Sequence, residues 1–139
     1  MSFQLKTREV DGVLILAPEG RLAAGEALEE FRAALDAAFA AGHTRIVLDM
    51  TRVSYIDSSA LGCLVVTHTR AQKAGGALAL FGLSLRNLEL MILTKLTTIF
   101  RLHETEIDAV NSVIPGREAP HIDILEFVQR QRAERREAE

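Results

Sequence analysis

With 139 residues, 48% of them hydrophobic, the chain is long enough for one compact domain and too short for two. Its formal net charge of -3 argues against a basic surface for nucleic acid or anionic lipid, and no apolar run approaches the roughly 18 residues that cross a bilayer. A single cysteine, Cys63, excludes an internal disulfide and no secretory leader pattern is present, so we expect a cytoplasmic protein with no membrane insertion.

The N-terminal part of the sequence predicts two paired strands. Residues 3–9 alternate apolar and polar side chains, which is typical of a half-exposed strand. Asp11-Gly12 predicts a tight hairpin turn, because glycine accepts the positive φ that such a turn requires. The continuous apolar run 13–17 then predicts a more buried strand in the same sheet, followed by a loop over residues 18–25.

A helix is predicted next, over residues 27–41, where apolar side chains recur at three- and four-residue steps until Gly42 ends the repeat. The short β-branched run 45–49 predicts a central strand that is covered on both faces. A strand, a helix and a strand in this order favour a right-handed crossover between parallel neighbours. Because the first two strands form a hairpin, we expect a mixed sheet.

The same alternation continues as far as residue 113. Further helices are predicted at 58–73, 85–93 and 103–113, and further strands at 77–81 and 97–102. The side chains expected to face the core from these helices are Leu61, Leu64, Val65, His68, Leu85, Leu88, Ile92, Ile107, Val110 and Val113. We interpret Cys63 as a small core residue and His68 as packed at the core's edge. No histidine has metal-ligand spacing, so neither a metal nor another cofactor is expected.

Residues 47–62 are the most informative stretch. A short apolar run leads through a turn-prone segment to Asp57-Ser58-Ser59, directly before a helical repeat begins at Leu61. Asp57 and Ser58 are therefore candidate N-cap residues, because a short side-chain oxygen can accept a hydrogen bond from a first-turn N–H. A helix N-terminus also favours a bound phosphate. These residues are thus either structural caps or part of a switch.

The order of these segments resembles a known family. A strand, then Val-Ser-Tyr-Ile-Asp-Ser-Ser-Ala-Leu-Gly over residues 53–62, then an apolar helix and Gly75-Gly76 resembles the signature of the STAS family, the sulfate transporter and anti-sigma factor antagonist domains. A Leu-x-x-Ile-Phe-Arg-Leu pattern at 96–102 is similar to that family too, and the resemblance spans residues 3–113. It implies a single α/β STAS domain over residues 1–114, with a mixed β-sheet covered by about four helices.

Within this family the chain is most similar to the free-standing bacterial anti-sigma factor antagonists. In those proteins the serine directly after the aspartate is phosphorylated by a partner kinase that is itself the anti-sigma factor. Here that serine is Ser58, with Ser59 as a second candidate. The resemblance implies a phosphorylation-switched anti-sigma factor antagonist with an anti-sigma factor serine kinase and a serine phosphatase as partners. The partner-binding residues it implies are Arg21, Leu22, Ala23, Asp57, Ser58, Ser59, Leu61 and Gly62.

An enzyme is not expected. The chain lacks a glycine-rich phosphate loop of recognised spacing, and Ser58 has no evident histidine partner for nucleophilic chemistry. The main alternative is an unphosphorylated STAS scaffold, either a subunit of a larger stress-signalling assembly or the soluble partner of a lipid or anion transporter. Asp57 and Ser58 would then be caps only.

Two positions depart from the family pattern. Ala60 stands where many antagonists have glycine. Ala23 stands where a Gly-x-Leu-Asp pattern places an acidic residue near the phosphorylated serine. Arg21 stands close by instead, and an arginine can pair with a phosphate as a bidentate donor.

Residues 115–139 form a tail beyond the family core, and opposite charges at near-helical steps predict an exposed helix there. Its apolar side chains, Ile124, Leu125 and Val128, have two interpretations. They belong to a frayed amphipathic end, or they cover part of the domain or a second copy of it, which would give a homodimer.

Overall fold

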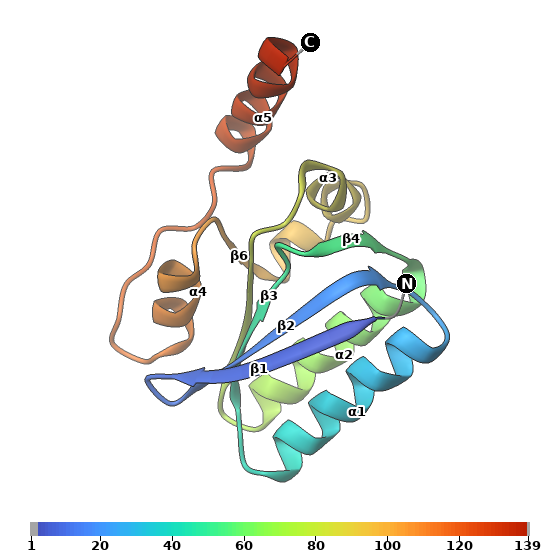
Figure 1. Ribbon diagram of the computed structural model, residues 1–139. Helices are drawn as coiled ribbons and strands as arrows, with labels where there is room; N and C mark the ends of the chain where they lie inside the picture. The colour runs from blue at the N-terminus through green and yellow to red at the C-terminus, as the bar shows by residue number, and fades with distance from the viewer. Residues whose placement is uncertain (1–2, 139) are drawn as a thin grey trace.

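The computed structural model describes residues 3–138 as an α/β domain with a helix at its C-terminal end (Figure 1). Its elements in chain order are β1 (Gln4–Val10), β2 (Val13–Leu22), α1 (Glu26–Ala40), β3 (Arg45–Asp49), β4 (Val53–Ile56), α2 (Ser58–Lys73), β5 (Ala77–Phe81), α3 (Leu85–Leu93), the 3-10 turn η1 (Leu96–Thr98), β6 (Arg101–His103), α4 (Glu106–Val113) and α5 (Ile124–Ala138).

A mixed sheet forms the centre of the fold. Its strands lie in the order β1-β2-β3-β5-β6, and β4 lies off this path, paired with β2. Among the described strands, β1 and β2 are antiparallel and every other pair is parallel. The predicted mixed sheet is therefore confirmed. The hairpin turn is confirmed too, because Asp11 and Gly12 have φ angles of 53° and 79°.

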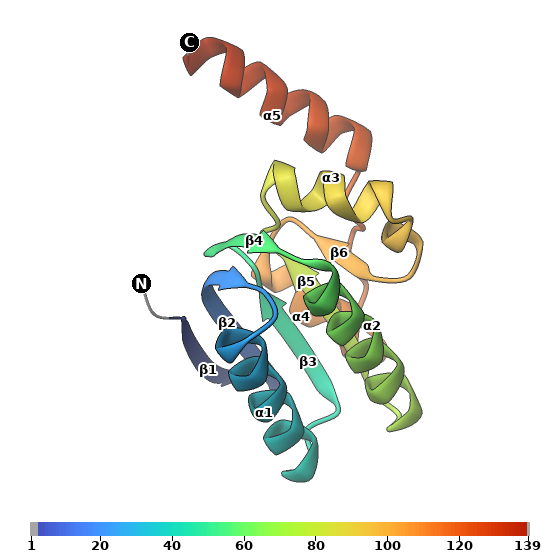
Figure 2. The same ribbon diagram turned by 90° about the vertical axis from the view of Figure 1, so that its right-hand side faces the viewer.

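Helices cover both faces of this sheet, as the α/β class requires. α1 and α2 lie side by side on one face and α4 lies on the other, while α3 lies across the end of the sheet next to β4 (Figure 1, Figure 2). The main core fills the space under α1, α2 and α3, where Phe31, Leu64 and Leu88 are fully buried. A smaller core lies under α4, where Val110 and Val113 meet the sheet.

The course of β2 differs from the prediction. β2 continues to Leu22 instead of ending before Pro18, and the turn-prone segment ahead of Asp57 contains β4. The C-terminal part of β2 and β4, neither of which was predicted as a strand, pair with each other, with Leu22 opposite Ile56. Pro18 is tolerated because it stands between the part of β2 that pairs with β3 and the part that pairs with β4.

The inward faces of α3 and α4 also differ in part from the prediction. Ile92 is 39% exposed and Ile107 is 68% exposed, whereas Met91 and Ala109 are buried. Both helices are short, so the branched side chains alone do not define the buried stripe, which in α3 includes Met91 in place of Ile92 and in α4 includes Ala109 beside the predicted Val110 and Val113. The predicted strand at 97–102 shrinks to β6 because η1 precedes it, and α4 begins only after its cap, Thr105.

Two predictions about single residues agree with the structure. Cys63 is buried in the main core as a small apolar residue. His68 is half-buried at the edge of the core, where its ring meets Phe100 edge-on at a centroid distance of 6.0 Å. None of the helices within residues 3–138 is long and apolar enough to span a membrane.

The tail is helical, as predicted, and α5 extends away from the domain beyond α3 (Figure 2). Phe127 and Val128 are half-buried against the main core, whereas Leu125 points into solvent with 68% of its surface exposed. The tail therefore packs on the domain at its beginning and leaves one large apolar side chain uncovered.

The linker before α5 is attached to β6. The Ile122 N–H donates to the Leu102 carbonyl at 3.1 Å. His103 is buried, and its Nδ1 lies 2.9 Å from the Pro120 carbonyl oxygen. Burial lowers the pKa of His103, so this side chain stays neutral near pH 7 and holds the linker as a hydrogen-bond donor.

Candidate phosphorylation and partner-binding site

Asp57 links two segments at the N-terminus of α2. Its Oδ1 accepts a hydrogen bond from the Ala60 N–H at 2.8 Å, which is the N-cap interaction predicted from the sequence. Its Oδ2 accepts from the Ala24 N–H, also at 2.8 Å, so the same carboxylate fixes the loop between β2 and α1. The bonds from Ala24 and Ala60 hold the pKa of Asp57 below its ordinary value of 3.8.

The two serines that follow are not needed for this cap. Ser58 and Ser59 are both exposed, and Asp57, rather than Ser58, stands at the N-cap position with extended backbone angles. Beneath them Ile56, Ala60 and Leu61 are buried and fix the first turn of α2 on the main core. The result is a rigid helix end that presents two hydroxyl groups to solvent.

The predicted partner-binding residues divide among three hollows of the surface. Arg21 and Ala23 line one of about 570 Å³, which also includes Phe3. Asp57, Ser58 and Leu61 line a second of about 540 Å³. Ser59 and Gly62 line a third of about 440 Å³, between α1 and α2. The bond from Ala24 to Asp57 joins the segments of the first two hollows, so most of the predicted residues belong to one continuous region of the surface.

Leu22 and Leu61 have a different place from the other predicted residues. Both side chains are buried, Leu22 at the end of β2 and Leu61 in the first turn of α2. Their contribution to a partner surface is therefore to support it from beneath. Their burial follows from the apolar pattern of the two elements they belong to.

α3 supplies residues to the site that the sequence analysis missed. Arg86, Leu90, Leu93 and Thr94 line the same hollow as Ser58. The buried side chain of Asn87 holds α3 in this place, because its Nδ2 donates to the Val53 carbonyl of β4 at 3.0 Å. Asn87 lies outside the apolar face predicted for this helix, so nothing in the sequence indicated that it would anchor α3.

Part of the border of this hollow is apolar. Leu93, at 81%, is the most exposed of the large apolar side chains, and the neighbouring Ile92 is partly exposed as well. Polar Ser58 and apolar Leu93 therefore border the same concave surface. A hydroxyl beside exposed leucine is a surface suited to contact with another protein rather than to binding a small ion.

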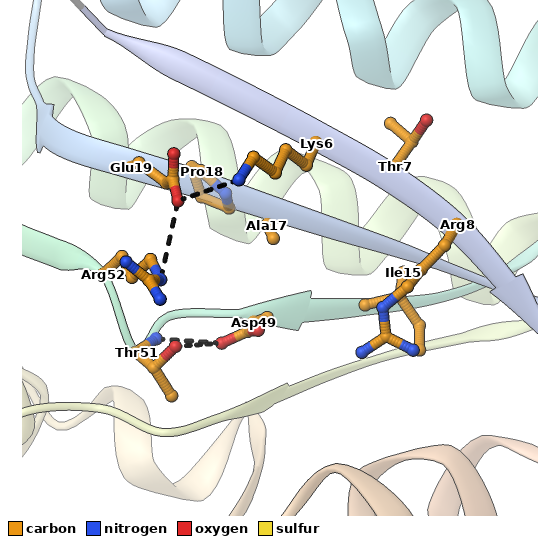
Figure 3. A pocket seen from close by; sticks show the side chains of 10 residues that line it. All are labelled: Lys6, Thr7, Arg8, Ile15, Ala17, Pro18, Glu19, Asp49, Thr51 and Arg52. Atoms are coloured by element: carbon orange, nitrogen blue, oxygen red, sulfur yellow. Dashed lines mark hydrogen bonds and ion pairs between the residues drawn. The ribbon is translucent and has the colours of Figure 1, made fainter.

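A further hollow, of about 490 Å³, lies on the sheet face beside β1, β2 and β3, away from the two serines (Figure 3). Its charges largely neutralise one another. Glu19 lies 3.7 Å from Lys6 and 3.5 Å from Arg52, and Asp49 accepts hydrogen bonds from the backbone and hydroxyl of Thr51 (Figure 3). With its carboxylates already paired, this hollow is the weaker candidate. Within residues 3–138, no three metal-binding side chains gather at one place.

Comparison with known proteins gives one family and several similar structures. The family model that matches is that of the STAS domain, over residues 4–109. An anti-sigma factor antagonist from Mycobacterium paratuberculosis is 22% identical with a TM-score of 0.70, and the match covers 81% of this chain and 94% of that one. A putative anti-sigma factor antagonist from Thermotoga maritima is 26% identical with a TM-score of 0.69, covering 78% and 93%.

The phosphorylated form of SpoIIAA, a cell fate determinant of Bacillus, has the same fold. It is 23% identical with a TM-score of 0.61, and the match covers 80% of this chain and 98% of that one. A comparison with curated proteins found no significant match. The family match and the similar structures agree with each other and with the domain that the sequence predicts.

Proposed function

The chain belongs to the STAS domain family, and on that premise we propose that it is an anti-sigma factor antagonist, a binding module switched by phosphorylation of Ser58. The observation that carries this proposal is the division of roles at the start of α2. Asp57 makes the cap, and Ser58 is left exposed beside the apolar rim of a hollow. A kinase can therefore reach the Ser58 hydroxyl without opening the fold.

The unmodified protein would bind an anti-sigma factor kinase and so release a sigma factor. The surface offered to that partner comprises the exposed parts of the β2–α1 loop with Arg21 and Ala23, the first turns of α2 with Ser58, Ser59 and Gly62, and Leu93 of α3. Exposed leucine beside polar groups is the composition expected of a reversible protein contact. This function requires a cytoplasmic location.

Phosphorylation would switch the contact off. The kinase would transfer the γ-phosphoryl group of ATP to the Ser58 Oγ, releasing ADP, while the hydroxyl proton passes to a base of the kinase. The product adds nearly two negative charges at the start of α2, where the helix dipole tolerates an anion. The fold would persist, and the partner's contact would weaken through repulsion and the cost of burying the charge. A serine phosphatase would restore binding.

Mass spectrometry of the protein isolated from its own cells tests the modification. We expect phosphate on the peptide that contains Ser58 and Ser59, on Ser58, in an amount that changes with growth conditions. Binding to a kinase-like ATPase encoded nearby tests the switch. We expect Ser58→Ala to bind like the unmodified protein and Ser58→Asp to bind at least about tenfold more weakly. Ser59→Asp is the matched control and should weaken binding less. Equal affinity of both Ser58 variants would contradict the switch.

A second candidate function rests on the tail. If the chain is instead an unphosphorylated STAS scaffold in a larger complex or beside a transporter, the exposed Leu125 on α5 would belong to the contact surface. Size-exclusion chromatography of the full chain and of a chain ending before Pro115 separates the cases. A homodimer through the tail would lose half its mass on truncation, and an unmodified Ser58 under every growth condition would favour the scaffold.

A further inference from the structure

Two arginines share one aromatic ring beside the candidate phosphorylation site. The guanidinium carbon of Arg21 lies 4.3 Å from the centroid of the Tyr55 ring, and that of Arg86 lies 5.3 Å from it. Arg21 and Tyr55 are partners in the parallel pairing of β2 with β4, and Arg86 comes from the first turn of α3. Three elements therefore converge to bring two positive charges to one ring, an arrangement that cation–π attraction stabilises.

Neither arginine has a carboxylate partner within residues 3–138. Other arginines of the domain do, as with Arg52 and Glu19 or Arg70 and Asp36. A guanidinium stacked on a ring keeps its in-plane N–H donors available, and these match the oxygens of a phosphate. The pair is thus a cationic surface that no carboxylate of residues 3–138 neutralises.

The position of Arg86 indicates which group could supply a negative charge to this pair of arginines. Arg86, Tyr55 and Ser58 line the same hollow of about 540 Å³. The two carboxylates of this hollow are engaged elsewhere, since Asp57 accepts from backbone N–H groups and Glu89 lies 3.9 Å from Arg132. A phosphoryl group on Ser58 would therefore enter a hollow in which Arg86 is the available cation.

We propose that Arg86, supported by Arg21 across the Tyr55 ring, binds the phosphoryl group of phosphorylated Ser58. The inference rests on the proposed phosphorylation of Ser58, and the binding step itself forms and breaks no covalent bond. Phosphorylation then has two effects on the partner surface, because it adds negative charge and it also pairs the Arg86 guanidinium with an anion. Ala23, two residues after Arg21, supplies no carboxylate that would compete for that guanidinium.

The experiment installs phosphoserine at position 58 of the full chain by genetic encoding and follows its 31P resonance through a pH titration. The second ionisation of phosphoserine lies near pH 6, and a nearby cation favours the dianion and lowers this value. We expect Arg86→Gln to raise the phosphate pKa by about half a unit, and Arg21→Gln to raise it less. Arg52→Gln is the charge-matched control and should leave it unchanged.

A second control places phosphoserine at position 59, which lines a different hollow, and there Arg86→Gln should have no effect. The proposal is wrong if Arg86→Gln and Arg52→Gln leave the same titration curve for phosphoserine 58. It is also wrong if Arg86→Gln does not change the titration curve of phosphoserine 58 but the unphosphorylated Arg86→Gln variant binds the partner more weakly. The arginine would then bind carboxylates of the partner. Since the phosphate is installed without any kinase, the result stands whether or not cells phosphorylate Ser58.

Discussion

At its C-terminal end α2 is followed by close backbone contacts, whereas at its N-terminal end the side chain of Asp57 joins the helix to the neighbouring loop. After the C-terminus, the Gly76 N–H donates to the Ala71 carbonyl at 2.9 Å, and the Ala77 N–H donates to the Thr44 carbonyl at 3.0 Å. A Cβ atom on Gly76 would lie 1.8 Å from the Thr44 oxygen. At the N-terminus the corresponding work is done by the carboxylate of Asp57.

The two ends therefore differ in how their anchoring uses the side chains. At the C-terminal end the tightest point, Gly76, has no space for a side chain, because a Cβ there would meet the Thr44 backbone. The N-terminal end is equally well anchored, but its anchor occupies a single residue and leaves the next two side chains exposed. Variants at both ends test this contrast.

Gly76→Ala should have the largest effect on stability. The added methyl group meets backbone atoms, which cannot move aside as a flexible side chain can, so we expect a loss of about 3 kcal/mol or more in the free energy of unfolding. Urea denaturation measures it. Gly62→Ala is the matched control within α2, because a Cβ there meets nothing within 4 Å, and it should stabilise the protein by about 0.5–1 kcal/mol. Equal effects of the two substitutions would remove the contrast.

Asp57→Ala should come next, with a loss of about 2 kcal/mol, because it removes the helix cap and the bond to the Ala24 N–H together. Thermal and urea denaturation measure this loss, and Ser59→Ala, two residues further along α2, is the control. A change below about 0.5 kcal/mol would show that the side chain does not anchor this end of α2.

The same carboxylate predicts a pH dependence. The folded state lowers the pKa of Asp57, so its ionised form contributes stability above the ordinary value of 3.8, and this contribution is lost as pH falls through the folded value. Asp57→Asn should therefore be less stable than the parent chain at neutral pH and should approach it in acid. Urea denaturation at several pH values measures the gap. A gap of constant size from neutral pH to pH 2 would contradict the prediction.

Arg70→Ala should have a smaller effect at the other end. Arg70 pairs with Asp36 on α1 and lies 4.4 Å from the Phe39 ring, but all of this is near the surface, so we expect a loss of about 0.5 kcal/mol. The loss should shrink in high salt because the ion pair is screened. Lys73→Ala, in the same turn, should change stability less.

Ser58→Ala should have the smallest effect of all, within about 0.3 kcal/mol, because Asp57 and not Ser58 caps the helix. Denaturation of this variant beside Asp57→Ala measures the two roles separately. A loss near that of Asp57→Ala would mean that Ser58 is a structural cap, and the switch would lose its main support.

Much of the fold could be predicted because its signals are local. α2 was predicted over residues 58–73 and is observed over Ser58–Lys73, since an apolar repeat and a cap define it within its own sequence. β4 could not be found in this way, because its four residues become a strand only by pairing with the distant end of β2. From local sequence, Pro18 and Gly20 predict that the strand ends, but the long-range pairing of β2 with β4 keeps this segment extended.

The site, too, was predictable where its signals are local and was not predictable where it depends on tertiary packing. Asp57 and Ser58 stand where strand-like spacing changes to helix-like spacing, so their place at a helix start followed from the sequence. Arg86 was missed because its position depends on where α3 packs, and that is decided by the bond from Asn87 to Val53. When a tertiary contact of this kind brings residues together, the sequence has no periodic pattern that predicts their proximity.

The separation of cap from hydroxyl at the start of α2 has a consequence for how such proteins diverge. Replacement of Ser58 should leave folding intact, so folding alone does not select for a serine at this position. Asp57 would be retained, because folding selects for it whether or not a signal passes through the protein. If the proposed switch is correct, the residue that follows this aspartate would then distinguish chains that can be phosphorylated from chains that cannot.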